Sequence, residues 1–138
     1  MKGKGLSFLR VVDANLNRAR EGLRVCEEVA RFILEEPRLT HRCRQIRYDL
    51  NRLSRSLGGA ALVKARDSRR DVGRPAVRGK GSPHRGIRDL VAANSRRIQE
   101  AFRVLEEFTR LSSVRSSKEF GHLRFRVYSL EQDLLSEL

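Results

Sequence analysis

The chain has 138 residues, a length that suits one compact domain and argues against two. Lys and Arg number 30 against 17 Asp and Glu, so the formal net charge is +13 and we expect an anionic partner such as a phosphate. Hydrophobic residues make up 39%, no stretch has the length of a membrane span, and no signal peptide is recognisable, so we expect a cytoplasmic protein without membrane contact.

Apolar residues recur with helical spacing along most of the chain, and Gly, Pro and Ser clusters interrupt them. Four helices are expected, with approximate bounds Arg10 to Leu34, Leu39 to Leu57, Ile87 to Leu111 and Lys118 to Glu137. Between the second and the third, residues 58–86 are rich in Gly, Pro and Arg, which favours a long basic loop.

The sequence of the first predicted helix occurs twice in the chain. The segment from Ala14 to Arg31 returns 79 residues later as the segment from Ala93 to Arg110, with Asn, Arg and paired Glu residues at the same positions. The repeat therefore comprises residues 10–57 and 87–137, joined by the loop 58–86. It predicts an all-α fold in which a duplicated helix hairpin forms a single four-helix bundle with approximate two-fold symmetry.

Each copy places an Asn and an Arg beside its apolar stripe. Asn15 projects with that stripe and Arg18 lies at its edge, and Asn94 and Arg97 repeat the arrangement. Buried polar groups must find partners. Two interpretations stay open: the four side chains satisfy backbone and each other, or they line a polar end of the bundle that receives an anion.

The loop begins with a compact group of charges in the stretch from Ala65 to Gly73. One helical turn there would bring Asp67 and Asp71 to the same side, where two carboxylates suit a hydrated Mg²⁺ beside a phosphate chain. The same pattern also fits a salt-bridged last helical turn that ends at Gly73. Further on, Arg78 and Lys80 stand among glycines in a segment that lacks the full Walker pattern and reads as a basic lid.

Other residue types point to structure. Cys26 and Cys43 lie inside apolar segments without a CxxC pair, which favours reduced, buried thiols. The three histidines lie far apart and lack metal-ligand spacing.

Three motifs in this order resemble a small family of alternative hydroxymethylpyrimidine-phosphate kinases, found alone or fused to the N-terminus of thiamine-phosphate synthase. The motifs are the Asn-x-x-Arg-x-x-Glu helix from Asn15, the Ala-Arg-Asp-Ser-x-x-Asp-Val-Gly segment from Ala65, and the repeated helix from Ala93. The chain departs from the pattern at Ser68, where Thr is expected, and at Arg74, where a small polar residue is commoner.

The resemblance implies transfer of the γ-phosphoryl group of ATP to 4-amino-5-hydroxymethyl-2-methylpyrimidine phosphate, with Mg²⁺, in thiamine biosynthesis. The acceptor is an ionised phosphate monoester, so the reaction needs positioning and charge neutralisation rather than a general base. On this reading Arg18, Arg97, Asp67 and Asp71 are catalytic, and either aspartate holds the metal. Asn15, Asn94, Arg66 and Gly73 would bind the substrate, and Arg78 and Lys80 the nucleotide.

Two other function classes stay open. The charge also suits a helical nucleic-acid-binding or regulatory module, although no aromatic RNA-binding pattern accompanies it. The chain could also be an assembly domain that docks on thiamine-phosphate synthase without chemistry of its own. The sequence leaves open a homo-oligomer and does not say which half of the repeat binds ATP.

Overall fold

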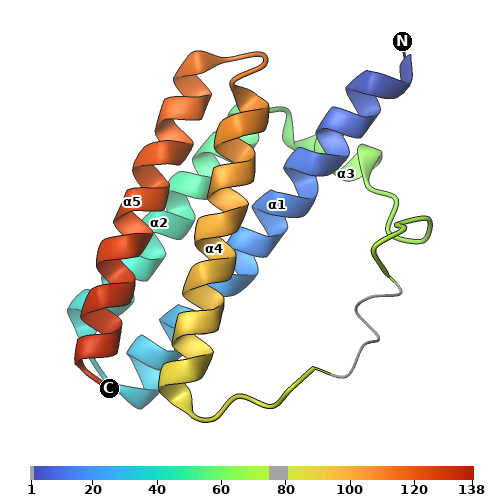
Figure 1. Ribbon diagram of the computed structural model, residues 1–138. Coiled ribbons are helices and arrows are strands. Elements are labelled where there is room, and N and C mark those ends of the chain that lie inside the picture. The colour runs from blue at the N-terminus through green and yellow to red at the C-terminus, as the bar shows by residue number, and fades with distance from the viewer. Residues whose placement is uncertain (1, 75–80) are drawn as a thin grey trace.

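The computed structural model describes residues 2–74 and 81–138. Four long helices, α1 (Lys2–Glu28), α2 (Pro37–Ser56), α4 (Ile87–Thr109) and α5 (Val114–Ser136), lie side by side as a bundle (Figure 1). No strand occurs in the described residues. The all-α expectation is therefore confirmed.

The helices end where the local sequence favours it. After α1, a short π-helix, η1 (Val29–Ile33), leads to Glu35, which has a positive φ of 50°. Glu36 then caps α2 by accepting a hydrogen bond from the Arg38 backbone N–H, and Pro37 occupies the first turn. Gly58 follows α2 in the left-handed region, with φ 91°, as glycine readily does.

The core is one continuous cluster of buried aliphatic side chains to which every helix contributes, with Phe102 and Phe120 as its buried aromatics. Cys26 and Cys43 lie within it and are fully buried, as expected. Burial raises the pKa of the Cys26 thiol to about 11 and that of Cys43 to about 12, so both stay protonated at neutral pH.

Each of the two hairpins has its own Glu–Arg pair, at equivalent positions of the repeat. In the first, the buried Glu27 on α1 accepts a hydrogen bond from Arg44 on α2 at 2.9 Å. In the second, Glu106 on α4 accepts one from Arg124 on α5 at 3.0 Å. These pairs tie each long helix to its hairpin partner and match the repeat that the sequence shows.

Some of the expected bounds were wrong. The first helix begins at Lys2 rather than near Arg10, and Phe8 on the added turns packs against Phe108 with ring centroids 6.5 Å apart. The predicted loop 58–86 contains a helix, α3 (Gly59–Ala65), because Leu62 and Ala65 are buried. Helix α5 begins before Lys118, since Ser113 caps it by accepting the Ser116 N–H.

Among the described residues, no helix has the length and hydropathy needed to cross a membrane.

Candidate functional site

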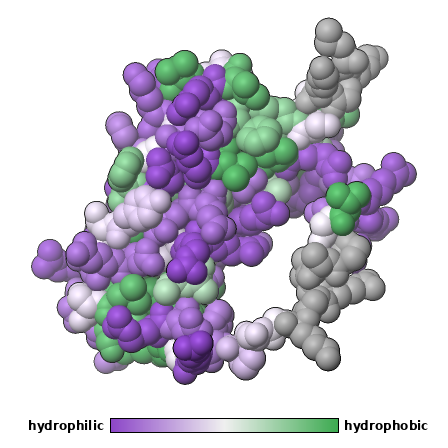
Figure 2. Space-filling view, viewed as in Figure 1, coloured by the Kyte–Doolittle hydropathy of each residue, from purple (hydrophilic) through white to green (hydrophobic). Residues whose placement is uncertain are grey.

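A hollow of about 590 Å³ lies between the N-terminal half of α1 and the segment that follows α3. Figure 2 shows hydrophilic residues along this side of the helical body. We call it the first hollow; most of its lining residues are polar or charged, and they include Arg10, Asp13, Asn15, Arg18, Arg66, Asp67 and Asp71, with Val104 from α4. It brings together five of the side chains that the sequence singled out.

Asn15 and Arg18 form one unit on α1. The buried Asn15 donates from Nδ2 to the Val11 carbonyl at 2.9 Å, which fixes its amide against its own helix. Its Oδ1 then accepts a hydrogen bond from Arg18 at 3.3 Å. The Arg18 guanidinium is otherwise exposed and has no carboxylate partner among the described residues, so it is held in place but keeps donors for an anion.

Arg66 anchors the segment to the bundle. It follows α3 as its C-cap and donates two hydrogen bonds to the buried carboxylate of Asp13 on α1, at 2.7 and 2.8 Å. The hydrogen bond and charge of Asp13 raise the pKa of Arg66 above its ordinary value. The contact is a planar, bidentate pair, and it sets where residues 67–71 begin relative to α1.

The two aspartates of the segment line the same hollow without the helical turn that was predicted for them. Asp67 Oδ1 accepts the Arg70 backbone N–H at 3.2 Å, and Asp71 Oδ1 accepts the Gly73 N–H at 2.8 Å. The segment 66–74 is irregular, so turns of this kind, rather than a helix, bring the carboxylates together.

Gly73 lies beside the first hollow. It lines an adjoining hollow of about 540 Å³ together with Arg18, Ser68, Arg69, Asp71 and Arg74. The two spaces share three of these residues, so the segment and Arg18 form one continuous polar surface.

The repeated pair lies elsewhere. Asn94 and Arg97 on α4 line a second hollow of about 600 Å³, together with Glu21, Gly22, Val25, His84, Ala93, Arg96 and Glu100. A Cβ added at Gly22 on α1 would lie 3.2 Å from the Asn94 carbonyl oxygen, and Cys26 Sγ lies 3.8 Å from Ser95 Oγ, so Asn94 packs against α1 between Gly22 and Cys26. These positions are seven and eleven residues beyond Asn15, which places Asn94 roughly 10 to 16 Å from Asn15 along the helix axis.

The interpretation in which all four side chains line one polar end of the bundle is therefore wrong. The four repeated side chains occupy two hollows at different heights along the α1–α4 pair, because antiparallel packing carries equivalent residues to opposite ends. Arg78 and Lys80 fall outside the described residues.

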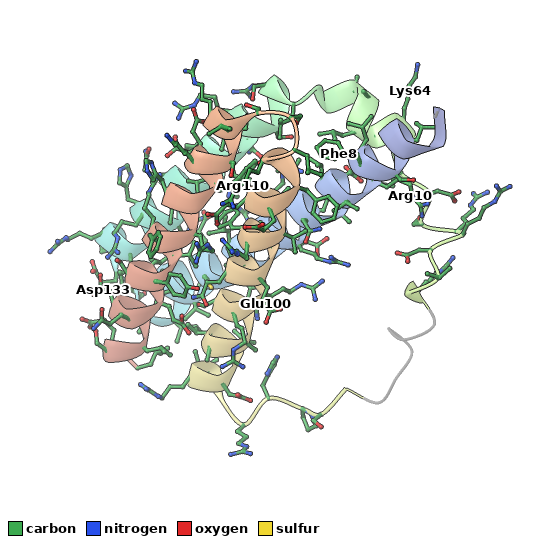
Figure 3. The ribbon with its side chains drawn as sticks, turned by 45° about the horizontal axis from the view of Figure 1, so that its top comes forward. Phe8, Arg10, Lys64, Glu100, Arg110 and Asp133 are labelled. Carbon is green, nitrogen blue, oxygen red and sulfur yellow. The ribbon has the colours of Figure 1, made fainter. Side chains whose placement is uncertain are left out.

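Two residues of the first hollow, Asp13 and Arg10, were not predicted from the sequence. Asp13 has Ala92 as its counterpart in the repeat, and this difference between the copies was the available signal. Arg10 reaches the same segment, donating to the Asp67 carbonyl at 3.4 Å, and Figure 3 shows it beside the chain that follows α3.

The donor set bears on Mg²⁺. Among the described residues, no group of three or more His, Cys, Asp and Glu side chains is arranged to hold a metal ion. Asp67 and Asp71 nevertheless line one hollow, and each carboxylate uses only one oxygen for a backbone N–H. Magnesium in phosphoryl-transfer sites is held by one or two carboxylates plus substrate phosphates, and these residues fit that role.

The match to a known family decides the classification. The ThiD2 family matches residues 10–133, which include the first copy of the repeat, the segment between the copies and most of the second copy. The chain belongs to the ThiD2 family. No solved structure shows a significant match to the chain.

Several curated relatives of this ThiD2 chain are named thiamine-phosphate synthase. That of Synechocystis sp. is 42% identical over 129 residues, which cover 94% of this chain and 36% of the relative. That of Nostoc punctiforme is 36% identical over 126 residues, covering 91% and 35%. That of Thermosynechococcus vestitus is 38% identical over 131 residues, covering 95% and 36%. The chain therefore spans about a third of the length of these relatives.

Proposed function

We propose that the chain is an ATP-dependent kinase that phosphorylates 4-amino-5-hydroxymethyl-2-methylpyrimidine phosphate to its pyrophosphate, with the reaction taking place in the first hollow. Membership of the ThiD2 family and similarity to proteins named thiamine-phosphate synthase support a role in thiamine biosynthesis. The observation that carries the specific reaction is the convergence of Arg18, Asp67 and Asp71 on one hollow.

The proposed chemistry needs charge neutralisation above all. The acceptor phosphate and the γ-phosphate of ATP are both anionic, and bringing them into line costs Coulomb energy that arginines can offset. Arg18, oriented by Asn15, is placed to donate to the acceptor phosphate, and its planar fork allows two hydrogen bonds. Arg10, on the same helix, adds a second positive charge to the hollow.

The carboxylates would serve the metal. Asp67 and Asp71 would hold Mg²⁺, which when bound neutralises charge on the transferred phosphoryl group. Arg66, neutralised by Asp13, would act mainly by positioning the segment that carries both aspartates. Gly73 donates its N–H to Asp71 and so fixes that carboxylate. Arg78 and Lys80 remain proposed nucleotide-binding residues.

Asn94 and Arg97 lie too far along the α1–α4 pair to contact a ligand that is bound beside Asn15. We therefore assign them to the second hollow and not to the reacting phosphates. We also propose that the chain associates with thiamine-phosphate synthase, as a domain fused to the N-terminus of that enzyme would.

The test is a substrate comparison. The purified chain is incubated with ATP, Mg²⁺ and either the pyrimidine alcohol or its phosphate, and ADP is measured. ADP release that depends on the phosphate supports the kinase. Equal release with the alcohol, or none with either substrate, contradicts it, and tight salt-dependent binding of nucleic acid would then favour the alternative module.

A further inference from the structure

The second hollow has the same construction as the first. Five of its lining residues occupy the repeat positions that Val104, Ala14, Asn15, Asn17 and Arg18 occupy in the first hollow: Val25, Ala93, Asn94, Arg96 and Arg97. The volumes also agree, at about 600 and 590 Å³. Duplication of the hairpin has therefore produced two related hollows rather than one site and one remnant surface.

The second copy keeps the same anchoring contact. Asn94 donates from Nδ2 to the Leu90 carbonyl at 2.9 Å, as Asn15 does to the carbonyl of Val11. Within the described residues, Asn94 Oδ1 accepts no hydrogen bond, and the guanidiniums of Arg96 and Arg97 form no ion pair or hydrogen bond. The hollow thus presents two guanidiniums with all their donors available.

This availability contrasts with other arginines of the same helix. Arg103, two turns further along α4, pairs with Glu107 at 3.0 Å and with Glu106 at 3.4 Å. Carboxylates are also near Arg97, since Glu21 and Glu100 line the same hollow, but neither forms an ion pair with a described residue. Figure 3 shows Glu100 on α4, the helix that carries Asn94 and Arg97.

The second hollow lacks the aspartates to which the proposed function assigns the metal in the first hollow. Ala92 stands at the repeat position of Asp13, and among the described residues no buried acid pairs with an arginine at this hollow and no pair of aspartates lines it. His84 enters from the chain before α4, with its Nδ1 3.5 Å from Asp89. Guanidinium donors without such groups suit binding of an anion rather than its conversion.

We propose that the second hollow is a binding site for the phosphate group of a small molecule, held by Arg97 and Arg96. This site goes beyond the kinase reaction and does not depend on it. Two sources share the chemistry: a free phosphate compound, or a nucleotide whose phosphates carry Mg²⁺. Glu21 and Glu100 distinguish them, because carboxylates repel a free phosphate but can contact a bound cation.

The experiment is an NMR titration of the full chain with inorganic pyrophosphate and, separately, with ATP and Mg²⁺. We expect saturable shifts at the Asn94 side-chain amide and at residues 93–97 with at least one probe. Arg97→Ala should weaken this binding about tenfold or more, because it removes charge-assisted hydrogen bonds, while shifts around Asn15 persist. Arg115→Ala, which removes an equal charge from an exposed position on α5, should have little effect.

Glu100→Gln identifies the source. Tighter pyrophosphate binding indicates a free phosphate compound, and weaker binding of ATP with Mg²⁺ indicates a metal-bound nucleotide. The proposal is overturned if neither probe gives saturable shifts at residues 93–97, or if Arg97→Ala behaves like Arg115→Ala. Since the readout is binding alone, a chain that binds here but releases no ADP would refute the kinase and leave this site standing.

Discussion

Arg66→Ala tests how the segment is held over the first hollow. The substitution removes two short hydrogen bonds and leaves the Asp13 carboxylate, whose side chain is only 7% exposed, without its bidentate partner. Removing one member of a fully buried pair costs about 3–5 kcal/mol, whereas exposed pairs contribute about 0–1 kcal/mol. The Arg66 side chain is 45% exposed, so we expect an intermediate loss of about 1–3 kcal/mol in the free energy of unfolding.

The assay is urea denaturation followed by circular dichroism, with the acceptor KM measured in parallel. KM should rise, because the segment that carries Asp67 and Asp71 loses its anchor. Arg70→Ala is the matched control, because the Arg70 side chain is 89% exposed and its Nε lies 4.0 Å from the Asp67 carboxylate. This substitution should change the free energy of unfolding by less than about 0.5 kcal/mol. Adding Asp13→Asn to Arg66→Ala should recover part of the loss by removing the buried charge that Arg66 no longer pairs with. Equal effects of Arg66→Ala and Arg70→Ala would show that the Arg66–Asp13 pair does not anchor the segment.

Three further predictions concern the bundle. Burial acts to raise the pKa of Glu27, but hydrogen bonds from Arg44 and Arg47 and the charges of Arg47 and Arg24 hold it below its ordinary value. The stabilisation from Glu27 is therefore present above that ordinary value and is lost as the pH falls below it. Glu27→Gln should therefore flatten the acid limb of a urea-midpoint profile between about pH 3 and 6. Gly22→Ala would place a Cβ 2.6 Å from Ile98 Cγ1, and we expect a loss of about 1–3 kcal/mol in chemical denaturation. Cys26 and Cys43 should resist a thiol reagent at neutral pH until urea unfolds the chain.

Each of these has a matched comparison. Glu119→Gln, at a more exposed pair on α5, should leave the acid limb intact. Gly59→Ala meets no atom within 4 Å at the start of α3 and should cost nothing, so similar losses at both glycines would contradict the packing argument. Rapid labelling of either thiol in the native chain would contradict the burial of the cysteines.

The sequence predicted the bundle because its signals were periodic and repeated. Apolar spacing identified the long helices, and Pro37 and Gly58 stood at real boundaries. Helix α3 was not predicted, because the many glycines and prolines of residues 58–86 favoured a loop, although Leu62 and Ala65 supply a short buried face.

The candidate site was predicted in part. Local motifs pointed to Asn15, Arg18, Arg66 and the two aspartates, and the structure brings these into one hollow. Their separation from Asn94 and Arg97 depends on the antiparallel packing of α1 against α4, which no local pattern encodes. Asp13 was not predicted because its partner, Arg66, follows α3 and lies 53 positions further along the chain, a contact that no local pattern encodes.

The most direct test of the proposed reaction is ³¹P NMR of the purified chain with ATP, Mg²⁺ and the pyrimidine monoester. We expect the monoester resonance to give way to two coupled diphosphate resonances. We also expect Arg18→Ala to reduce this conversion by about tenfold or more, through loss of charge-assisted hydrogen bonds, while the circular dichroism spectrum stays helical. An unchanged monoester signal with the wild-type chain, or full conversion by Arg18→Ala, would contradict it.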